Sequence, residues 1–191
     1  MDIFAYSKHL SYCFESCFLQ EFTERIQNKE TEIYNEFSLQ HELGIYLRNV
    51  LPGYKVQFER NVKFFNISNT IKSEIDIVVY NENEKFAIEL KHPLNGQYPK
   101  QMYSFIKDIR FMEELKEQGF TNTYCFTLVD DKNFYSGRVQ DGIYSFFRAG
   151  KPISGIIEKP TTDDVPSINI SKEYIVSWEP CGKMKYYIIE I

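Results

Sequence analysis

Two carboxylates and a lysine are the residues of this chain best suited to chemistry. Asp76 is followed after twelve intervening residues by Glu89, and Lys91 stands two positions beyond Glu89. A pair of carboxylates can bind a divalent cation such as Mg²⁺, which also accepts water and phosphate oxygens as ligands. A lysine on the same side can hold a phosphate or an attacking water. These residue types therefore point to metal-assisted chemistry on a phosphate-containing substrate.

The segment that carries these residues, 74–91, is predicted to be a β-hairpin. Two apolar runs flank the polar sequence Asn-Glu-Asn-Glu, and residues of each run alternate between two faces. With the turn in that polar sequence, Tyr80 lies opposite Lys85, and Asp76 lies opposite or diagonal to Glu89. Facing carboxylates repel each other, and a cation between them would reverse that effect. The alternative is a half-buried hairpin whose charged face is simply solvated.

The spacing of these residues resembles the D…(D/E)xK core of the PD-(D/E)xK nuclease superfamily, which has a restriction-endonuclease-like fold. The family name includes a proline before the aspartate, and Ile75 takes that place here, as in many relatives. The resemblance implies that Asp76, Glu89 and the Leu90 carbonyl bind Mg²⁺ or Mn²⁺. Lys91 would hold the attacking water or stabilise the transition state. The implied reaction is phosphodiester hydrolysis, with DNA as the expected substrate and a 5′-phosphate as product.

A helix predicted over 32–50 precedes the hairpin and ends before a Leu-Pro-Gly sequence. In the family, a helix in this place often supplies a glutamate to the metal site. Glu36 and Glu42 both flank the buried stripe of the helix, so either could reach inward. Glu42 is the better match for that role, and Glu36 is the second candidate. For either glutamate, the alternative is an ordinary solvated side chain.

Basic residues are concentrated between the helix and the hairpin. From residue 48 to residue 72 there are five basic residues and one acidic residue, in a chain of net charge −5. Arg60 and Lys63, in a strand predicted over 54–65, are candidates for contact with DNA phosphates. A solvated strand face explains them equally well.

A second helix is predicted over 99–118, with Pro99 in its first turn and a glycine after its end. Several branches of the family carry a glutamine or a basic residue on the helix that follows the ExK strand. Gln101 and Lys100 resemble that position and are further candidates for DNA contact, with ordinary helix surface as the alternative.

The predicted fold class is α/β, with a mixed sheet flanked by helices. The near-continuous apolar run at 123–129 is typical of a strand buried on both faces. Together with the earlier elements it gives the order αβββαβ, which is the core order of the restriction-endonuclease-like fold. We expect a single domain over 1–191, with its core at about 32–130, a β-rich extension at about 132–191 and an N-terminal helix at 2–28.

The β-rich extension contains short apolar runs punctuated by glycine and proline. A hairpin is predicted around Gly182. The extension could lengthen the main sheet or form a small β-subdomain that caps the site. Its predicted strands are 143–148, 153–157, 174–178 and 184–191.

Composition limits where the protein acts and what it binds. The net charge of −5 argues against indiscriminate binding to nucleic acid. The sequence lacks a secretory leader and a membrane-length apolar run, and its four cysteines form no disulfide framework or zinc pattern. We therefore expect a cytoplasmic protein with no membrane partner. DNA, a homodimer partner and a protein that supplies specificity are the expected partners.

Two readings from other classes remain open. A non-catalytic nucleic-acid-binding or assembly protein could retain the nuclease fold, because one fold hosts many functions. An unrelated α/β protein would be favoured if Glu42 lay far from the hairpin.

Overall fold

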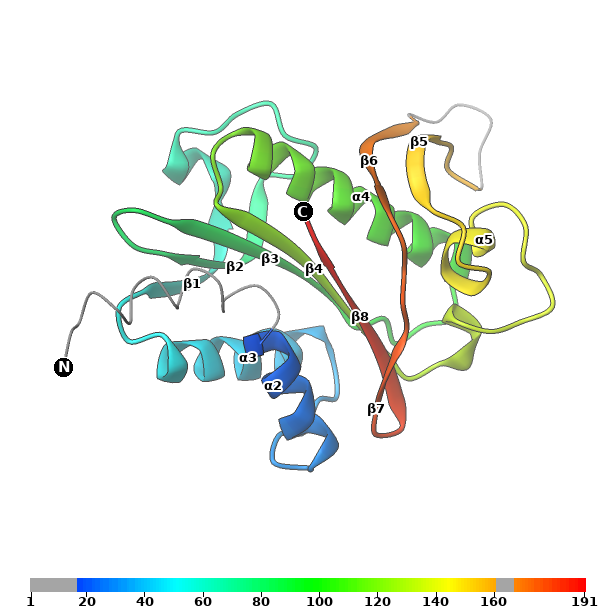
Figure 1. Ribbon diagram of the computed structural model, residues 1–191, viewed down its shortest axis with the longest axis horizontal. Helices are drawn as coiled ribbons and strands as arrows, with labels where there is room; N and C mark the ends of the chain where they lie inside the picture. The colour runs from blue at the N-terminus through cyan, green and yellow to red at the C-terminus, as the bar shows by residue number, and fades with distance from the viewer. Residues whose placement is uncertain (1–16, 161–166) are drawn as a thin grey trace.

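The protein is built on a six-stranded mixed sheet with helices on both faces (Figure 1). The structure is a computed structural model that describes residues 17–160 and 167–191. The strands follow the order β1-β2-β3-β4-β8-β7; only β3 and β4 run parallel, and the other neighbouring pairs are antiparallel. These strands are β1 (Lys55–Asn61), β2 (Glu74–Tyr80), β3 (Lys85–Lys91), β4 (Asn122–Val129), β7 (Glu179–Cys181) and β8 (Met184–Glu190).

Each face of the sheet has its own hydrophobic core. Helices α2 (Cys17–Gln27) and α3 (Glu36–Val50) cover one face, and α4 (Tyr98–Glu117) lies across the other (Figure 1). Alternation along the strands divides the side chains, since Ile77 and Ile88 pack toward α3 whereas Val78 and Ala87 pack toward α4. The protein therefore has the α/β architecture expected from its sequence.

A capping box sets the start of α3. The Asn35 side chain accepts a hydrogen bond from the Ser38 backbone at 2.7 Å, and the Ser38 hydroxyl accepts one from the Asn35 backbone at 3.0 Å. The prediction that this helix begins at residue 32 is therefore wrong, because the reciprocal cap begins the helix at Glu36. Gly44 packs directly on β1, where a Cβ would overlap the ring of Phe58.

The hairpin has the predicted register. Tyr80 pairs with Lys85, and the pairing continues to Ile77 opposite Ile88. The Asn81 carboxamide closes the turn by accepting hydrogen bonds from the backbone of Asn83 and Glu84, at 2.8 and 2.9 Å. Asp76 and Glu89 follow directly beyond this last pair, and the Asp76 backbone donates to Glu89 Oε1 at 3.4 Å, as expected for residues that lie opposite or diagonal to each other.

The strand predicted over 54–65 is shorter in the structure. β1 ends at Asn61, and Val62–Phe65 form a 3₁₀ helix. The Asn61 side chain caps this turn by accepting a hydrogen bond from the Lys63 backbone at 3.0 Å. A local side-chain bond of this kind competes with the sheet ladder, which the alternating pattern could not reveal.

The remaining core elements, α4 and β4, agree with the predictions to within one residue at each end. The order α3-β1-β2-β3-α4-β4 is therefore the predicted αβββαβ order. Among the described residues, no helix is both long and apolar enough to span a membrane.

Two predictions in the extension are wrong. The run 143–148 contains a short helix, α5 (Tyr144–Arg148), instead of a strand. Apolar runs this short do not distinguish helix from strand, and packing of Phe146 and Phe147 into the core decides the outcome. The strand expected at 174–178 instead lies earlier in the chain, as β6 (Ile168–Tyr174). It was missed because the polar residues of β6 hide the alternation of the buried residues Ile168 and Ile170.

Both arrangements considered for the extension occur. β8 joins the main sheet beside β4, and the predicted hairpin at Gly182 connects it to β7. β5 (Ile153–Ile157) pairs with β6 as a separate two-stranded sheet on the α4 side (Figure 1). The predicted N-terminal helix is confirmed where it can be followed, as α2, and its first part lies outside the described residues.

Candidate active site

Charged side chains from five parts of the chain, namely α3, the connection before β2, β2, β3 and α4, converge at the end of the hairpin. β2 and β3 lie side by side there, the first turn of α3 approaches from one face, and the middle of α4 approaches from the other. The cluster consists of Glu36, Lys72, Asp76, Glu89, Lys91 and Asp108.

The two predicted carboxylates lie where the β2–β3 ladder stops. The Leu90 backbone N–H donates to Asp76 Oδ2 at 2.7 Å, and the Asp76 backbone N–H donates to Glu89 Oε1 at 3.4 Å. Side-chain oxygens thus take the place of backbone carbonyls as acceptors beyond the last Ile77–Ile88 pair. The cluster of facing carboxylates is held by the backbone itself.

Two lysines neutralise part of this charge. Lys72 Nζ contacts Glu89 Oε2 and lies 3.0 Å from Asp108 Oδ1. Lys91 Nζ lies 3.3 Å from Asp108 Oδ2, and it donates to the Leu90 carbonyl at 2.9 Å. The predicted Lys91 therefore stands next to the carboxylates, together with a second lysine that sequence reasoning missed.

Asp108 was also missed, although the sequence carries a signal for it. It is a buried carboxylate in the apolar stripe of α4, directly before the buried Ile109. A charge in such a stripe is buried only when it is paired. No comparable signal singles out Lys72, which belongs to the connection before β2.

Burial shapes the acidity of the carboxylates. Glu89 is 1% exposed, and burial raises its pKa well above the usual range, with further upward contributions from Asp76 and Asp108. Burial also raises the pKa of Asp76, to about 6, against the opposing charges of Lys91 and Lys72. These carboxylates would be stabilised in their charged forms by additional positive charge.

The pKa values of the two lysines are also raised, which for a lysine favours the charged form. Burial alone would lower the pKa of both Lys72 and Lys91. The neighbouring carboxylates, Asp108 foremost, outweigh burial and raise both pKa values above the ordinary lysine range. Both ammonium groups are therefore charged at neutral pH.

The composition of the cluster fits a divalent cation. Its four carboxylates exceed its two lysines by two charges when all are ionised. Asp76, Glu89 and the Leu90 carbonyl offer the oxygen donors that Mg²⁺ and Mn²⁺ prefer. Asp108 Oδ2, although buried and paired with Lys91, accepts no hydrogen bond from the described residues.

The side chains are arranged around lysine rather than around a metal. Within residues 17–160 and 167–191, no three His, Cys, Asp or Glu side chains are grouped closely enough to hold an ion. Lys72 contacts the Glu89 oxygen that a cation would use. Metal binding would therefore require its ammonium group to move aside.

Glu36, rather than Glu42, is the helix glutamate at this cluster. Glu36 Oε2 accepts a hydrogen bond from the His92 backbone at 3.1 Å, and Oε1 lies 3.7 Å from Lys91 Nζ. The Glu42 side chain is 39% exposed and pairs with His41. Six residues of an α-helix correspond to a rotation of about 600°, or about 240° beyond one full turn. Glu42 and Glu36 therefore point to different sides of α3.

Gln40 lies one turn after Glu36 on the same side of α3. Its Nε2 donates to the Asp76 carbonyl at 2.8 Å and to Glu59 Oε1 at 2.6 Å. Gln40 is itself buried. This side chain fastens the helix to the start of β2, and it was not identified from the sequence.

A small hollow of about 180 Å³ opens onto Asp76 between α3 and β1. Glu59, at its edge, has a φ of 47°, a left-handed conformation that is uncommon for a residue other than glycine. The β1–β2 pairing skips Glu59 and Asp76. Phe37, also in the lining, is 69% exposed. Local strain of this kind is frequent at functional sites.

The predicted DNA-contact residues lie outside the cluster. The Arg60 guanidinium stacks 3.6 Å from the centre of the Phe64 ring, and Lys63 is exposed. Lys100 is exposed on the first turn of α4, and Gln101 Nε2 donates to Asn95 Oδ1 at 3.1 Å. Their described partners belong to neighbouring surface segments.

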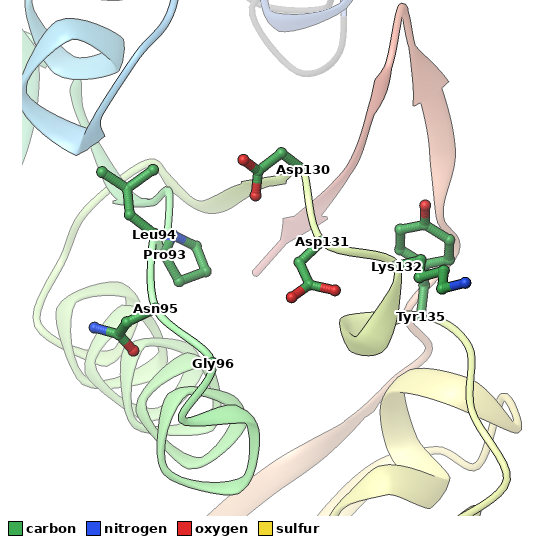
Figure 2. Close-up of a pocket in the computed structure, with 8 residues that line it drawn as sticks. All are labelled: Pro93, Leu94, Asn95, Gly96, Asp130, Asp131, Lys132 and Tyr135. Atoms are coloured by element: carbon green, nitrogen blue, oxygen red, sulfur yellow. The ribbon is translucent and has the colours of Figure 1, made fainter.

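A larger hollow of about 580 Å³ lies beyond the ends of β3 and β4 (Figure 2). The loop from Pro93 to Gly96 forms one side, and Asp130 to Lys132 form the other (Figure 2). The Asp131 carboxylate accepts hydrogen bonds from the Tyr98 hydroxyl at 2.5 Å and from the Asn133 backbone at 2.9 Å. Because these bonds explain Asp131 as a loop anchor, the hollow is a weaker candidate than the hairpin cluster.

No family model, no curated protein and no solved structure matches this chain. Functional assignment consequently rests on the chemistry and geometry of the cluster.

Proposed function

We propose that this protein is a Mg²⁺- or Mn²⁺-dependent nuclease of the PD-(D/E)xK type, with a restriction-endonuclease-like core, that hydrolyses phosphodiester bonds in DNA. The observation that carries the proposal is the facing pair Asp76 and Glu89 at the point where β2 and β3 part, with Lys91 beside them. The αβββαβ order and the approach of Glu36 add support.

Asp76, Glu89 and the Leu90 carbonyl hold the metal ion in this proposal. The bound cation supplies Lewis acidity and lowers the pKa of water. Lys91 positions the attacking water and offsets negative charge that develops on the phosphate. The water oxygen bonds to phosphorus and its proton passes to solvent. The bond from phosphorus to the 3′ oxygen breaks, and that oxygen takes a proton from solvent, so the products are a 3′-hydroxyl and a 5′-phosphate.

Glu36 and Asp108 act as positioning residues. Glu36 lies on the α3 side of Lys91, at 3.7 Å, and Asp108 lies on the α4 side, at 3.3 Å. Lys72 would have to leave Glu89 for a metal ion to be held there, and its contact with Asp108 at 3.0 Å would keep it near the site.

Cleavage of plasmid and single-stranded DNA tests this function. We expect the wild type to cut in Mg²⁺ or Mn²⁺ but not in chelator, and Lys91→Ala to lose at least about 100-fold in rate, in line with loss of a charge-stabilising group. Lys183→Ala, at an exposed turn, is the matched control and keeps full activity. Full activity in Lys91→Ala would remove the assignment.

A non-catalytic nucleic-acid-binding or assembly protein is the second candidate. The observation in its favour is the contact of Lys72 with Glu89 and Asp108, which balances buried charge without a metal. Calorimetric titration with Mn²⁺ separates the two functions. Uptake of Mn²⁺ that disappears in Asp76→Asn supports the nuclease, and absence of uptake supports the binding protein.

A further inference from the structure

A groove of about 480 Å³ lies between α4 and the ends of the β5–β6 sheet. Successive turns of α4 form the first wall. The residues that follow β5 and those at the start of β6 form the second wall. Its lining residues are Ile71, Lys100, Tyr103, Ser104, Lys107, Lys159, Ser167 and Ile168.

The described lining of the groove carries positive charge in an acidic protein. Lys100, Lys107 and Lys159 line it, and no aspartate or glutamate is among its described lining residues. Within the described ranges, none of these three lysines forms an ion pair, whereas Lys72 and Lys91 each form two. With a net charge of −5 for the chain, this groove is a local reversal of sign that favours an anionic ligand.

A buried carboxylate fixes the two walls relative to each other. Glu113 of α4 accepts hydrogen bonds from the backbone of Ser171 and Lys172 in β6, each at 3.0 Å. The Tyr174 hydroxyl adds a third from β6, at 3.2 Å. These bonds give β6 a defined position along α4.

The groove borders the hairpin cluster at two points of the chain. Ile71 lines the groove, and the next residue, Lys72, contacts Glu89. Lys107 also lines the groove, and the next residue, Asp108, pairs with Lys91. The lining of the groove thus includes the chain neighbours of two cluster residues, although no residue of the cluster itself lines it.

We propose that this groove binds the phosphodiester backbone of one nucleic-acid strand and leads it to the hairpin cluster. The inference rests on the proposed nuclease function, since it names the path of that enzyme's substrate. Lys100, Lys107 and Lys159 contact consecutive phosphates, and the β5–β6 sheet supplies the outer wall. Backbone contacts of this kind position a strand without reading its sequence.

Salt dependence of binding provides the test. Fluorescence anisotropy measures the affinity of a labelled single-stranded DNA oligonucleotide across a salt series, in the uncleaving Asp76→Asn background. Each lysine–phosphate contact contributes about 0.7 to the slope of log affinity against log salt concentration for a single strand. The double variant Lys107→Ala/Lys159→Ala should therefore lower the slope by about 1.4 and weaken binding.

The double variant Lys55→Ala/Lys183→Ala is the matched control, because it removes the same charge from exposed positions outside the groove. We expect its slope to equal that of the parent. Equal slopes in the two double variants, or no DNA binding by the Asp76→Asn parent, would overturn the proposal that the groove binds a nucleic-acid strand. Thermal unfolding of each double verifies that the fold is intact; if Lys107→Ala/Lys159→Ala unfolds, the single variants replace it, each with an expected decrease of about 0.7.

The two proposals fail in different ways. Binding that depends on Lys107 and Lys159, with no metal-dependent cleavage by the wild type, supports the groove and contradicts the nuclease. Metal-dependent cleavage with a slope that is unchanged in the groove variant supports the nuclease and contradicts the groove.

Discussion

At the scale of single residues, Asp76 shows a conflict between stability and function. Its carboxylate faces Glu89 in a buried position, where burial raises its pKa to about 6. Between about pH 4 and pH 6 the folded protein holds a proton that the unfolded chain, with an aspartate pKa near 3.9, has released. In the metal-free protein, the free energy of unfolding therefore decreases as pH rises from about 4 to about 6 because of this group.

Replacing Asp76 by asparagine should reverse this loss. We expect metal-free Asp76→Asn to be more stable than the wild type by about 1–3 kcal/mol at pH 7, with little difference near pH 4. Urea unfolding at both pH values measures the effect. Asp141→Asn, at an exposed position, serves as the control; an Asp76→Asn variant that is less stable at pH 7 would contradict the charge conflict.

The two helix glutamates give a second prediction at this scale. Glu36→Gln should lower the cleavage rate about 10- to 100-fold, since residues that orient the groups around a metal typically have effects of that size. Glu42→Gln should leave the rate unchanged because its side chain pairs with His41 instead. Cleavage assays on both variants compare them, and a loss confined to Glu42→Gln would exclude Glu36 from the site.

At the scale of elements, α4 has two tasks. Asp108 on one side of the helix holds the two lysines of the cluster, and Glu113 holds β6 through its backbone N–H groups. Burial would raise the pKa of Glu113, but the bonds from Ser171 and Lys172 outweigh burial and lower it. The stability it supplies is complete above the unfolded pKa of about 4.3 and is lost as pH falls through the lower folded value.

Glu113→Gln should accordingly destabilise the protein by about 2–4 kcal/mol at pH 7, because a neutral amide cannot satisfy all these donors. Denaturant unfolding measures the loss. Glu117→Gln is the control on the same helix, where a largely exposed glutamate pairs only with Arg110 and should contribute less than about 1 kcal/mol. Similar losses in both variants would show that the β6 contacts are not the cause.

At the scale of the whole molecule, metal binding should stabilise the fold. A ligand at about 100 times its dissociation constant adds about 2.7 kcal/mol to the free energy of unfolding. For a chain of this length that corresponds to an increase in Tm of about 5–10 °C. We expect Mn²⁺ to produce this increase in the wild type and not in Asp76→Asn, measured by differential scanning fluorimetry. An equal increase in both proteins would locate the binding site elsewhere.

Local sequence patterns were sufficient for most of the core elements. The period-two alternation on both sides of an Asn-rich turn predicted the register that pairs Tyr80 with Lys85, because a hairpin turn of known length leaves only one pairing. The apolar stripe of α4 and the continuous apolar run of β4 gave their limits to within one residue. In the extension, short runs such as 143–148 carried too few residues for a period to be distinguished.

The sequence by itself determined the order of the core elements and brought Asp76, Glu89 and Lys91 together, since the positions of these three depend on spacing along one hairpin. Only the tertiary structure decided which other groups complete the cluster. Glu36 replaces Glu42 because a capping box sets the phase of α3, and Lys72 and Asp108 join through long-range ion pairs. Contacts between distant parts of the chain depend on how whole elements pack, and no local period encodes that packing.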